Sequence, residues 1–140
     1  SVMYFLSGVI ENRTSIVTTN KTYIVSDRSI WSSIVVHYKK APDLLPKLCA
    51  LLSLIYPYVE FPEKVIVLDA GFKNVKERIL QKKQDELQMD LMLLPSQDTY
   101  EREMLFFYWL QALGVNVVFI DASFDADKVE QMVMKEIGIL

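Results

Sequence analysis

The residues with the clearest capacity for chemistry are an aspartate and an arginine side by side in TYIVSDRSIWSS, residues 22–33. A strand-favouring stretch leads directly into Asp27 and Arg28, and a helix-like pattern follows. A carboxylate can hold a magnesium-bound water or orient a hydroxyl, and a guanidinium can bind phosphate through two parallel hydrogen bonds. Beside a helix N-terminus this pair favours an anion site. The alternative from spacing alone is that Asp27 caps the helix and Arg28 is solvated.

Composition narrows the class of protein. The chain of 140 residues is long enough for one domain with a sizeable core, and 51% of it is hydrophobic. No apolar run reaches membrane-spanning length, and the N-terminal stretch lacks the cationic start of a secretory signal. Cys49 is the single cysteine, which fits a reducing compartment. A net charge of −3 does not favour nucleic-acid polymers. We therefore expect one intracellular domain, cytoplasmic or mitochondrial, that binds neither membranes nor nucleic acid.

Three short segments predict buried strands: residues 22–26, 64–68 and 116–120. Each is rich in β-branched or aromatic residues, and its apolarity is nearly continuous rather than alternating. Continuous apolarity indicates cover on both faces, as in a parallel sheet. Each segment is followed by an aspartate, namely Asp27, Asp69 or Asp121, and aspartates in that position commonly cap loops.

The intervening segments show helical periodicity. Helices are predicted over about 3–19, 27–38, 43–56, 74–93, 99–113 and 126–137, with Gly114 as a C-cap and Asp125 as an N-cap. Strands that alternate with helices predict an α/β fold, a three-layer sandwich with a parallel sheet. No strand precedes the first helix, so the first strand-loop-helix unit is missing or a partner completes the sheet. Helices that cover the sheet edges are the alternative.

Several motifs carry a resemblance to a known family. The stretch DRSIWSSIVVH resembles the Asp-Arg-x-x-x-Ser signature of thymidylate kinases, and it is similar to the Glu/Asp-Arg-Ser signature of deoxynucleoside kinases. FPEKVIVLDAGFKNVKERI looks like the family's following strand and helix, with Glu63 in place of an aspartate. KKQDEL falls where the family's lid begins, and residues 106–137, which begin with FFYWLQALG, resemble its final helix, strand and helix. The resemblance covers nearly the whole chain, although each motif is short.

The resemblance implies roles for residues near the acceptor. Arg13, at the end of FLSGVIENR, would contact the acceptor nucleotide, and Arg28 would hold its phosphate. Asp27 would be catalytic and would lie near the magnesium ion. Ser32 matches the family's serine, and His37 stands where thymidylate kinases read the base. The alternatives are a solvated helix face for Arg13 and a boundary position for His37.

The resemblance also implies phosphate or lid contacts on the donor side. Arg78 would meet phosphate or the adenine side, although a structural partner is an equal alternative. Lys82 and Lys83 stand where lid arginines are expected, and lysine is a point charge rather than a fork. A lysine pair on a helix is also commonly just solvated.

One departure from the family is decisive for activity. Kinases of this class need a Gly-x-x-x-x-Gly-Lys-Ser/Thr loop whose backbone N–H groups cradle ATP phosphates. Glycine occurs only at Gly8, Gly71, Gly114 and Gly138, and none of these begins such a motif. We therefore expect either the C-terminal two-thirds of a kinase domain or a degenerate relative that no longer phosphorylates.

Three functions follow as expectations. The first is a thymidylate kinase-like enzyme that, in the intact protein, uses ATP and Mg²⁺ to phosphorylate a nucleoside monophosphate. A deoxynucleoside kinase is the close alternative, with Asp27 as base on the 5′-hydroxyl. The second is a non-catalytic nucleotide-binding domain or a homodimer formed through the apolar helices. The third is an α/β domain of unrelated function.

Overall fold

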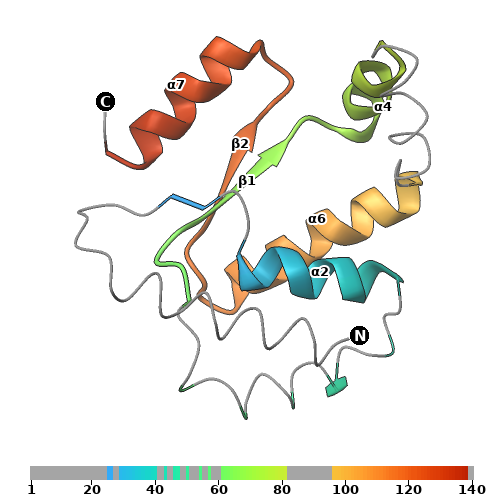
Figure 1. Cartoon of the computed structure of the whole chain (residues 1–140), viewed down its shortest axis with the longest axis vertical. Helices are drawn as coiled ribbons and strands as arrows, with labels where there is room; N and C mark the ends of the chain where they lie inside the picture. Colours follow the sequence, from blue (N-terminus) through green and yellow to red (C-terminus); the bar gives the residue numbers. More distant parts are fainter. Residues whose placement is uncertain are drawn as a thin grey trace. The chain divides into compact units, whose positions relative to one another are not determined.

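The structure of the chain is a computed structural model that describes part of the sequence. It covers residues 25–26, 29–40, 61–81 and 96–138, with isolated positions at 43, 46, 47, 50, 54 and 57. The chain divides into two compact units, Ser1–Pro62 and Glu63–Leu140. The predicted helices over 3–19 and 43–56 lie outside these ranges except at the isolated positions. The elements, drawn in Figure 1, are α2 (Ile30–Lys40), β1 (Val65–Asp69), α4 (Phe72–Leu80), α6 (Gln97–Ala112), β2 (Val117–Asp121) and α7 (Ala126–Glu136).

The second unit is built on a parallel pair of strands, as the sequence predicts. β1 and β2 pair in register from Val65 opposite Val117 to Asp69 opposite Asp121. The Val65 N–H donates to the Asn116 carbonyl at 2.9 Å, and the Ala122 N–H donates to the Asp69 carbonyl at 2.9 Å. Both strands lie one residue later than predicted. A mixed α/β fold with a small parallel sheet is therefore confirmed in this unit.

Helices cover both faces of the strand pair in this unit. α6 lies on one side and α7 on the other in Figure 1, and both contact β2. The Tyr108 ring of α6 stacks on Phe119 of β2, with centroids 4.1 Å apart. Side chains of a strand alternate between its faces. Burial from two sides thus explains the continuous apolarity of β2, whose buried residues Val117 and Ile120 lie on opposite faces, whereas Leu68 of β1 is 52% exposed.

The core of this unit consists of β-branched strand residues and one side of α6. Its buried residues are Val65, Val67, Ala70, Phe106, Phe107, Leu110, Val117, Ile120 and Ala122. Short runs of valine and isoleucine favour strands because their branched side chains pack well on a pleated surface. Along α6, Phe106, Phe107 and Leu110 recur at spacings of three and four residues.

Caps define where the helices begin. The Ser96 side chain accepts a hydrogen bond from the Thr99 N–H at the start of α6. The Asp125 side chain does the same for the Lys128 N–H at the start of α7, which confirms the predicted cap. Gly114 follows the end of α6 with φ of 95°, a left-handed conformation that glycine adopts without strain. α4 ends at Leu80, and the remainder of the predicted helix over 74–93 lies outside the described residues beyond Gln81.

The main described element of the first unit is the helix α2. Ile30, Ile34 and Val35 of this helix are buried, and the ring of Trp31 lies 5.2 Å from that of Phe61. Val25 and Ser26 have no regular secondary structure, so the strand predicted over 22–26 is not found at those two positions. Its other residues lie outside the described ranges. Among the described residues, none of the helices is long and apolar enough to cross a membrane.

Two leucines of α6 give a matched test of this packing. Leu110 is 2% exposed and Leu105 is 65% exposed. Leu110→Ala should lower the free energy of unfolding by about 2–5 kcal/mol, because it leaves a cavity in the core. Leu105→Ala should change it by no more than about 0.5 kcal/mol. Urea denaturation followed by circular dichroism measures both, and equal losses would contradict the packing described.

Candidate functional site

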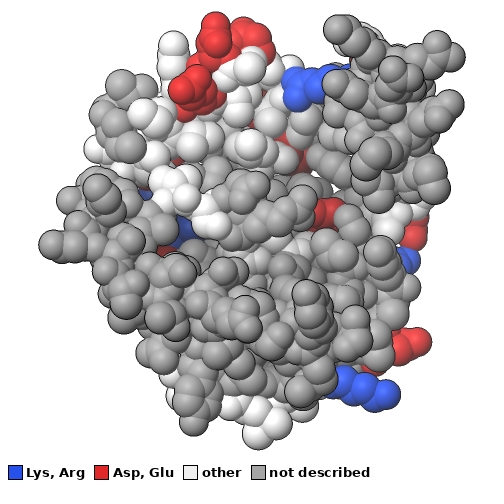
Figure 2. All heavy atoms as spheres, in the orientation of Figure 1, with Lys and Arg blue, Asp and Glu red and all other residues white. Residues whose placement is uncertain are grey.

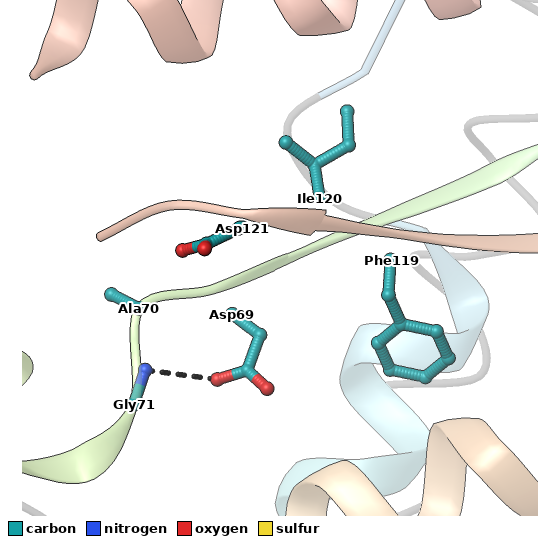
Figure 3. Close-up of a pocket in the computed structure, with 6 residues that line it drawn as sticks. All are labelled: Asp69, Ala70, Gly71, Phe119, Ile120 and Asp121. Atoms are coloured by element: carbon teal, nitrogen blue, oxygen red, sulfur yellow. Dashed lines mark hydrogen bonds between the residues drawn. The ribbon is translucent and has the colours of Figure 1, made fainter. Parts of the chain in front are cut away.

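An open hollow of about 430 Å³ lies at the carboxyl ends of β1 and β2 (Figure 3). Its lining is Asp69, Ala70, Gly71, Phe119, Ile120 and Asp121. Asp69 and Phe119 point to the same side of the strands, and Ile120 points to the other. Open parallel sheets bind ligands at this edge, where loops and helix N-termini converge. The hollow is therefore the candidate site within the described residues.

The two loops that border the hollow have similar sequences. LDAGF, residues 68–72, spans the end of β1, and IDASF, residues 120–124, spans the end of β2. In each loop the aspartate accepts a hydrogen bond from the N–H two residues later, Gly71 for Asp69 and Ser123 for Asp121, both at 2.9 Å. The alanine of each loop is buried. The expectation that strand-end aspartates cap loops is thus confirmed for both.

A tyrosine from α6 completes the first loop. The Tyr100 hydroxyl donates to Asp69 Oδ1 at 2.5 Å and accepts the Gly71 N–H at 3.1 Å. Burial and the hydrogen bond to Asp69 raise the pKa of Tyr100 to about 12. The hydroxyl therefore stays protonated at physiological pH and remains a donor. Gly71, at φ of 74°, lets α4 begin immediately after this turn.

Arg78 ties the second loop to α4. Its Nη2 donates to the carbonyls of Ala122 at 2.8 Å, Phe124 at 3.2 Å and Ser123 at 3.3 Å. Three carbonyls from consecutive residues converge on one guanidinium nitrogen, so Arg78 holds the shape of the β2–α7 loop. This is the structural partner that the sequence left open as an alternative to a phosphate contact.

The charge of the described residues that line the hollow is negative. Two carboxylates line it, and no lysine or arginine is among its lining residues. Asp121 is exposed, and hydrogen bonds from the side chain and backbone of Ser123 lower its pKa. Figure 2 shows acidic side chains gathered over the beginning of α7, where Asp125 and Asp127 lie. Acidic groups at a helix N-terminus interact favourably with its dipole.

Most of the predicted site residues are not among the residues that the structure describes. Arg13, Asp27, Arg28, Lys82 and Lys83 lie outside the described residues, so their predicted roles stay predictions. The predicted magnesium ligand, Asp27, is among them. Within the described part of the chain, no group of three or more His, Cys, Asp or Glu side chains could hold a metal ion.

Ser32 and His37 both lie in α2. The Ser32 hydroxyl accepts the Ser29 N–H at 3.4 Å, a long contact that reaches back over the start of the helix. Only the backbone of His37 is described, so its predicted base contact is untested. Among the described side chains with a predicted site role, Arg78 contacts one of the loops around the hollow.

Sequence reasoning missed Tyr100. This residue follows β1 by about 30 positions and sits in the first turns of a helix whose apolar pattern says nothing about its hydroxyl. The one available signal was a polar aromatic near a helix start, and that signal is too common to select it.

Comparison with known proteins found no similar protein. No family model, curated protein or solved structure matches this chain.

The raised pKa of Tyr100 predicts a pH effect. Its value of about 12 in the folded protein exceeds the ordinary 10.0, so folding favours the protonated phenol. This contribution to stability is fully present below pH 10 and is lost as the pH rises through 12. Tyr100→Phe should therefore be less stable than the wild type near neutral pH, and the difference should shrink between pH 10 and 12. Urea midpoints across this range measure it.

Tyr108→Phe is the matched control. Tyr108 lies on the same helix, and its hydroxyl has no hydrogen-bond partner among the described residues. This variant should follow the wild-type profile throughout. A Tyr100→Phe profile parallel to that of the wild type at every pH would contradict the assignment.

Proposed function

We propose that the intact protein is a nucleoside monophosphate kinase of the thymidylate kinase type, which transfers a phosphoryl group from ATP to a nucleotide with Mg²⁺. The observation that carries the proposal is the parallel pair β1 and β2, whose carboxyl ends open into one hollow bordered by the starts of two helices. Nucleotide-binding α/β proteins place their ligands at such an edge. The motifs that resemble thymidylate kinases are the further support.

The proposal includes a larger three-layer sandwich with a parallel sheet. Two features of β1 support additional strands. The backbone groups of Val65 and Asp69 form hydrogen bonds with β2. Because bonding directions alternate along a strand, the backbone groups of Ile66 and Leu68 point to the opposite edge of β1. There they have no hydrogen-bond partner among the described residues. Leu68 is also 52% exposed. An apolar strand with an unpaired edge is normally covered or paired.

The chemistry is assigned to residues near the acceptor. Asp27 would organise magnesium and the transferring phosphoryl group, and Arg28, with Arg13, would hold the acceptor phosphate. Ser32 and His37 would contact the substrate, and Lys82 and Lys83 would approach the donor phosphates. Phosphoryl transfer depends mainly on positioning and charge neutralisation, which these residue types supply.

The test is phosphorylation by the intact protein. With ATP, Mg²⁺ and thymidine monophosphate, ³¹P NMR should show formation of the diphosphate. Arg28→Met should lower kcat/KM about 10²–10³-fold, because it removes one charged donor from the transition state. Lys76→Met is the matched control, since Lys76 is exposed on α4 without a contact among the described residues, and it should leave the rate unchanged. Phosphorylation of thymidine alone would replace this proposal with the deoxynucleoside kinase alternative.

A non-catalytic dimerisation domain is the second candidate, and one observation favours it. α6 exposes four large apolar side chains: Leu105 at 65%, Tyr108 at 49%, Trp109 at 44% and Leu113 at 63%. Three of them recur every four residues, so they form one stripe along the helix. Exposed apolar stripes of this kind are common at protein interfaces.

Sedimentation equilibrium tests this candidate. If the stripe joins two copies, wild-type protein should sediment as a dimer, and Trp109→Ala should weaken the dimer by more than about tenfold. Gln97→Ala, exposed at the start of the same helix, should leave it intact. A monomeric wild type that phosphorylates thymidine monophosphate would rule out the second candidate.

A further inference from the structure

Among the described residues, the partners of the Asp69 carboxylate bind one of its two oxygens. Its Oδ1 accepts hydrogen bonds from the Gly71 N–H at 2.9 Å and from the Tyr100 hydroxyl at 2.5 Å. Its Oδ2 has no hydrogen-bond partner among the described residues, and the residue lines the hollow. An ionised carboxylate accepts at both oxygens. One oxygen therefore fixes the orientation of the side chain, and the other is an open acceptor with respect to the described residues.

We propose that Tyr100 is a positioning residue of the nucleotide site, which holds Asp69 so that Oδ2 accepts a hydrogen bond from a hydroxyl or amino group of the bound nucleotide. This inference rests on the proposed function. Tyr100 does not touch the ligand itself, because its hydroxyl is engaged by Asp69 and Gly71.

The charge of the hollow decides which part of a nucleotide it receives. Asp69 and Asp121 both line it, and paired strand positions bring them side by side. Like charges at such separations repel, so a phosphate group is disfavoured there. A carboxylate is an acceptor, and its complement is an O–H or N–H donor. The hollow therefore suits the sugar or base of the nucleotide rather than its phosphates.

The tyrosine hydroxyl is well suited to this task. With a pKa of about 12 it stays neutral, so it donates to Asp69 without adding a charge. It belongs to α6, which is anchored in the core by Phe106, Phe107 and Leu110. An aspartate held only by its own loop could rotate with that loop. The contact from α6 ties its orientation to the packed body of the unit.

The experiment is titration calorimetry of the intact protein with ADP in the absence of Mg²⁺. Tyr100→Phe keeps the ring beside Phe72, 6.1 Å away, and removes only the hydroxyl. It should weaken ADP binding about three- to tenfold, the range expected for one well-placed hydrogen bond. Asp69→Asn should weaken ADP binding at least as much. The double variant should bind no more weakly than Asp69→Asn alone, because both changes remove the same contact.

Two controls distinguish a positioning role of Tyr100 from a general disturbance of the fold. Tyr108→Phe removes a hydroxyl from the same helix and should bind ADP like the wild type. Binding of pyrophosphate, which has neither sugar nor base, should be unchanged by Tyr100→Phe and Asp69→Asn. Loss of pyrophosphate binding together with ADP binding would overturn the inference, because it indicates a disturbed fold.

Other outcomes distinguish a failure of this inference from a failure of the proposed function. If the two substitutions weaken ADP binding additively, or only when Mg²⁺ is present, Tyr100 does not act through a direct contact from Asp69 and the inference fails. If Asp69→Asn binds ADP like the wild type, the inference fails and the proposed function stands. If the wild type binds no nucleotide at all, both fail.

Discussion

The register between β1 and β2 is the constraint on which the rest of this unit depends. Because Asp69 lies opposite Asp121, both strands end at the same level and their loops leave the sheet at one edge. A shift of one residue would turn each side chain to the other face of the sheet. Phe119 would then lose its stacking partner Tyr108, and Ile120 would leave the core. Burial of the strands thereby fixes the position of the two carboxylates.

The two loops at this edge are held by side chains from helices α4 and α6. A short loop satisfies few of its own backbone groups, and here the missing partners come from other elements. Arg78 of α4 serves three carbonyls after β2, and Tyr100 of α6 serves the turn after β1. Arg78 lies on α4, which precedes β2 in the chain, and Tyr100 lies on α6, which follows β1. These contacts consequently hold the shape of this edge of the sheet within the protein itself.

This arrangement divides the proposed chemistry between two regions. The hollow carries negative charge and suits groups that donate hydrogen bonds. The cations assigned to phosphate, Arg13, Arg28, Lys82 and Lys83, belong to other stretches of the sequence. Arg78 is the basic candidate that the structure describes, and its Nη2 contacts the carbonyls of the loop after β2.

The sequence by itself determined the local elements: the two short strands, the start of α7 at Asp125 and the loop-capping aspartates. These depend on apolar periodicity and on contacts within three residues, which can be read along the chain. Only the tertiary structure decided that Tyr100 holds Asp69, that Arg78 holds the loop after β2, and that one stripe of α6 is exposed. The first two contacts join residues 31 and 44 positions apart. Partners at such distances are chosen by packing in space, and a helical pattern does not reveal which apolar side is covered.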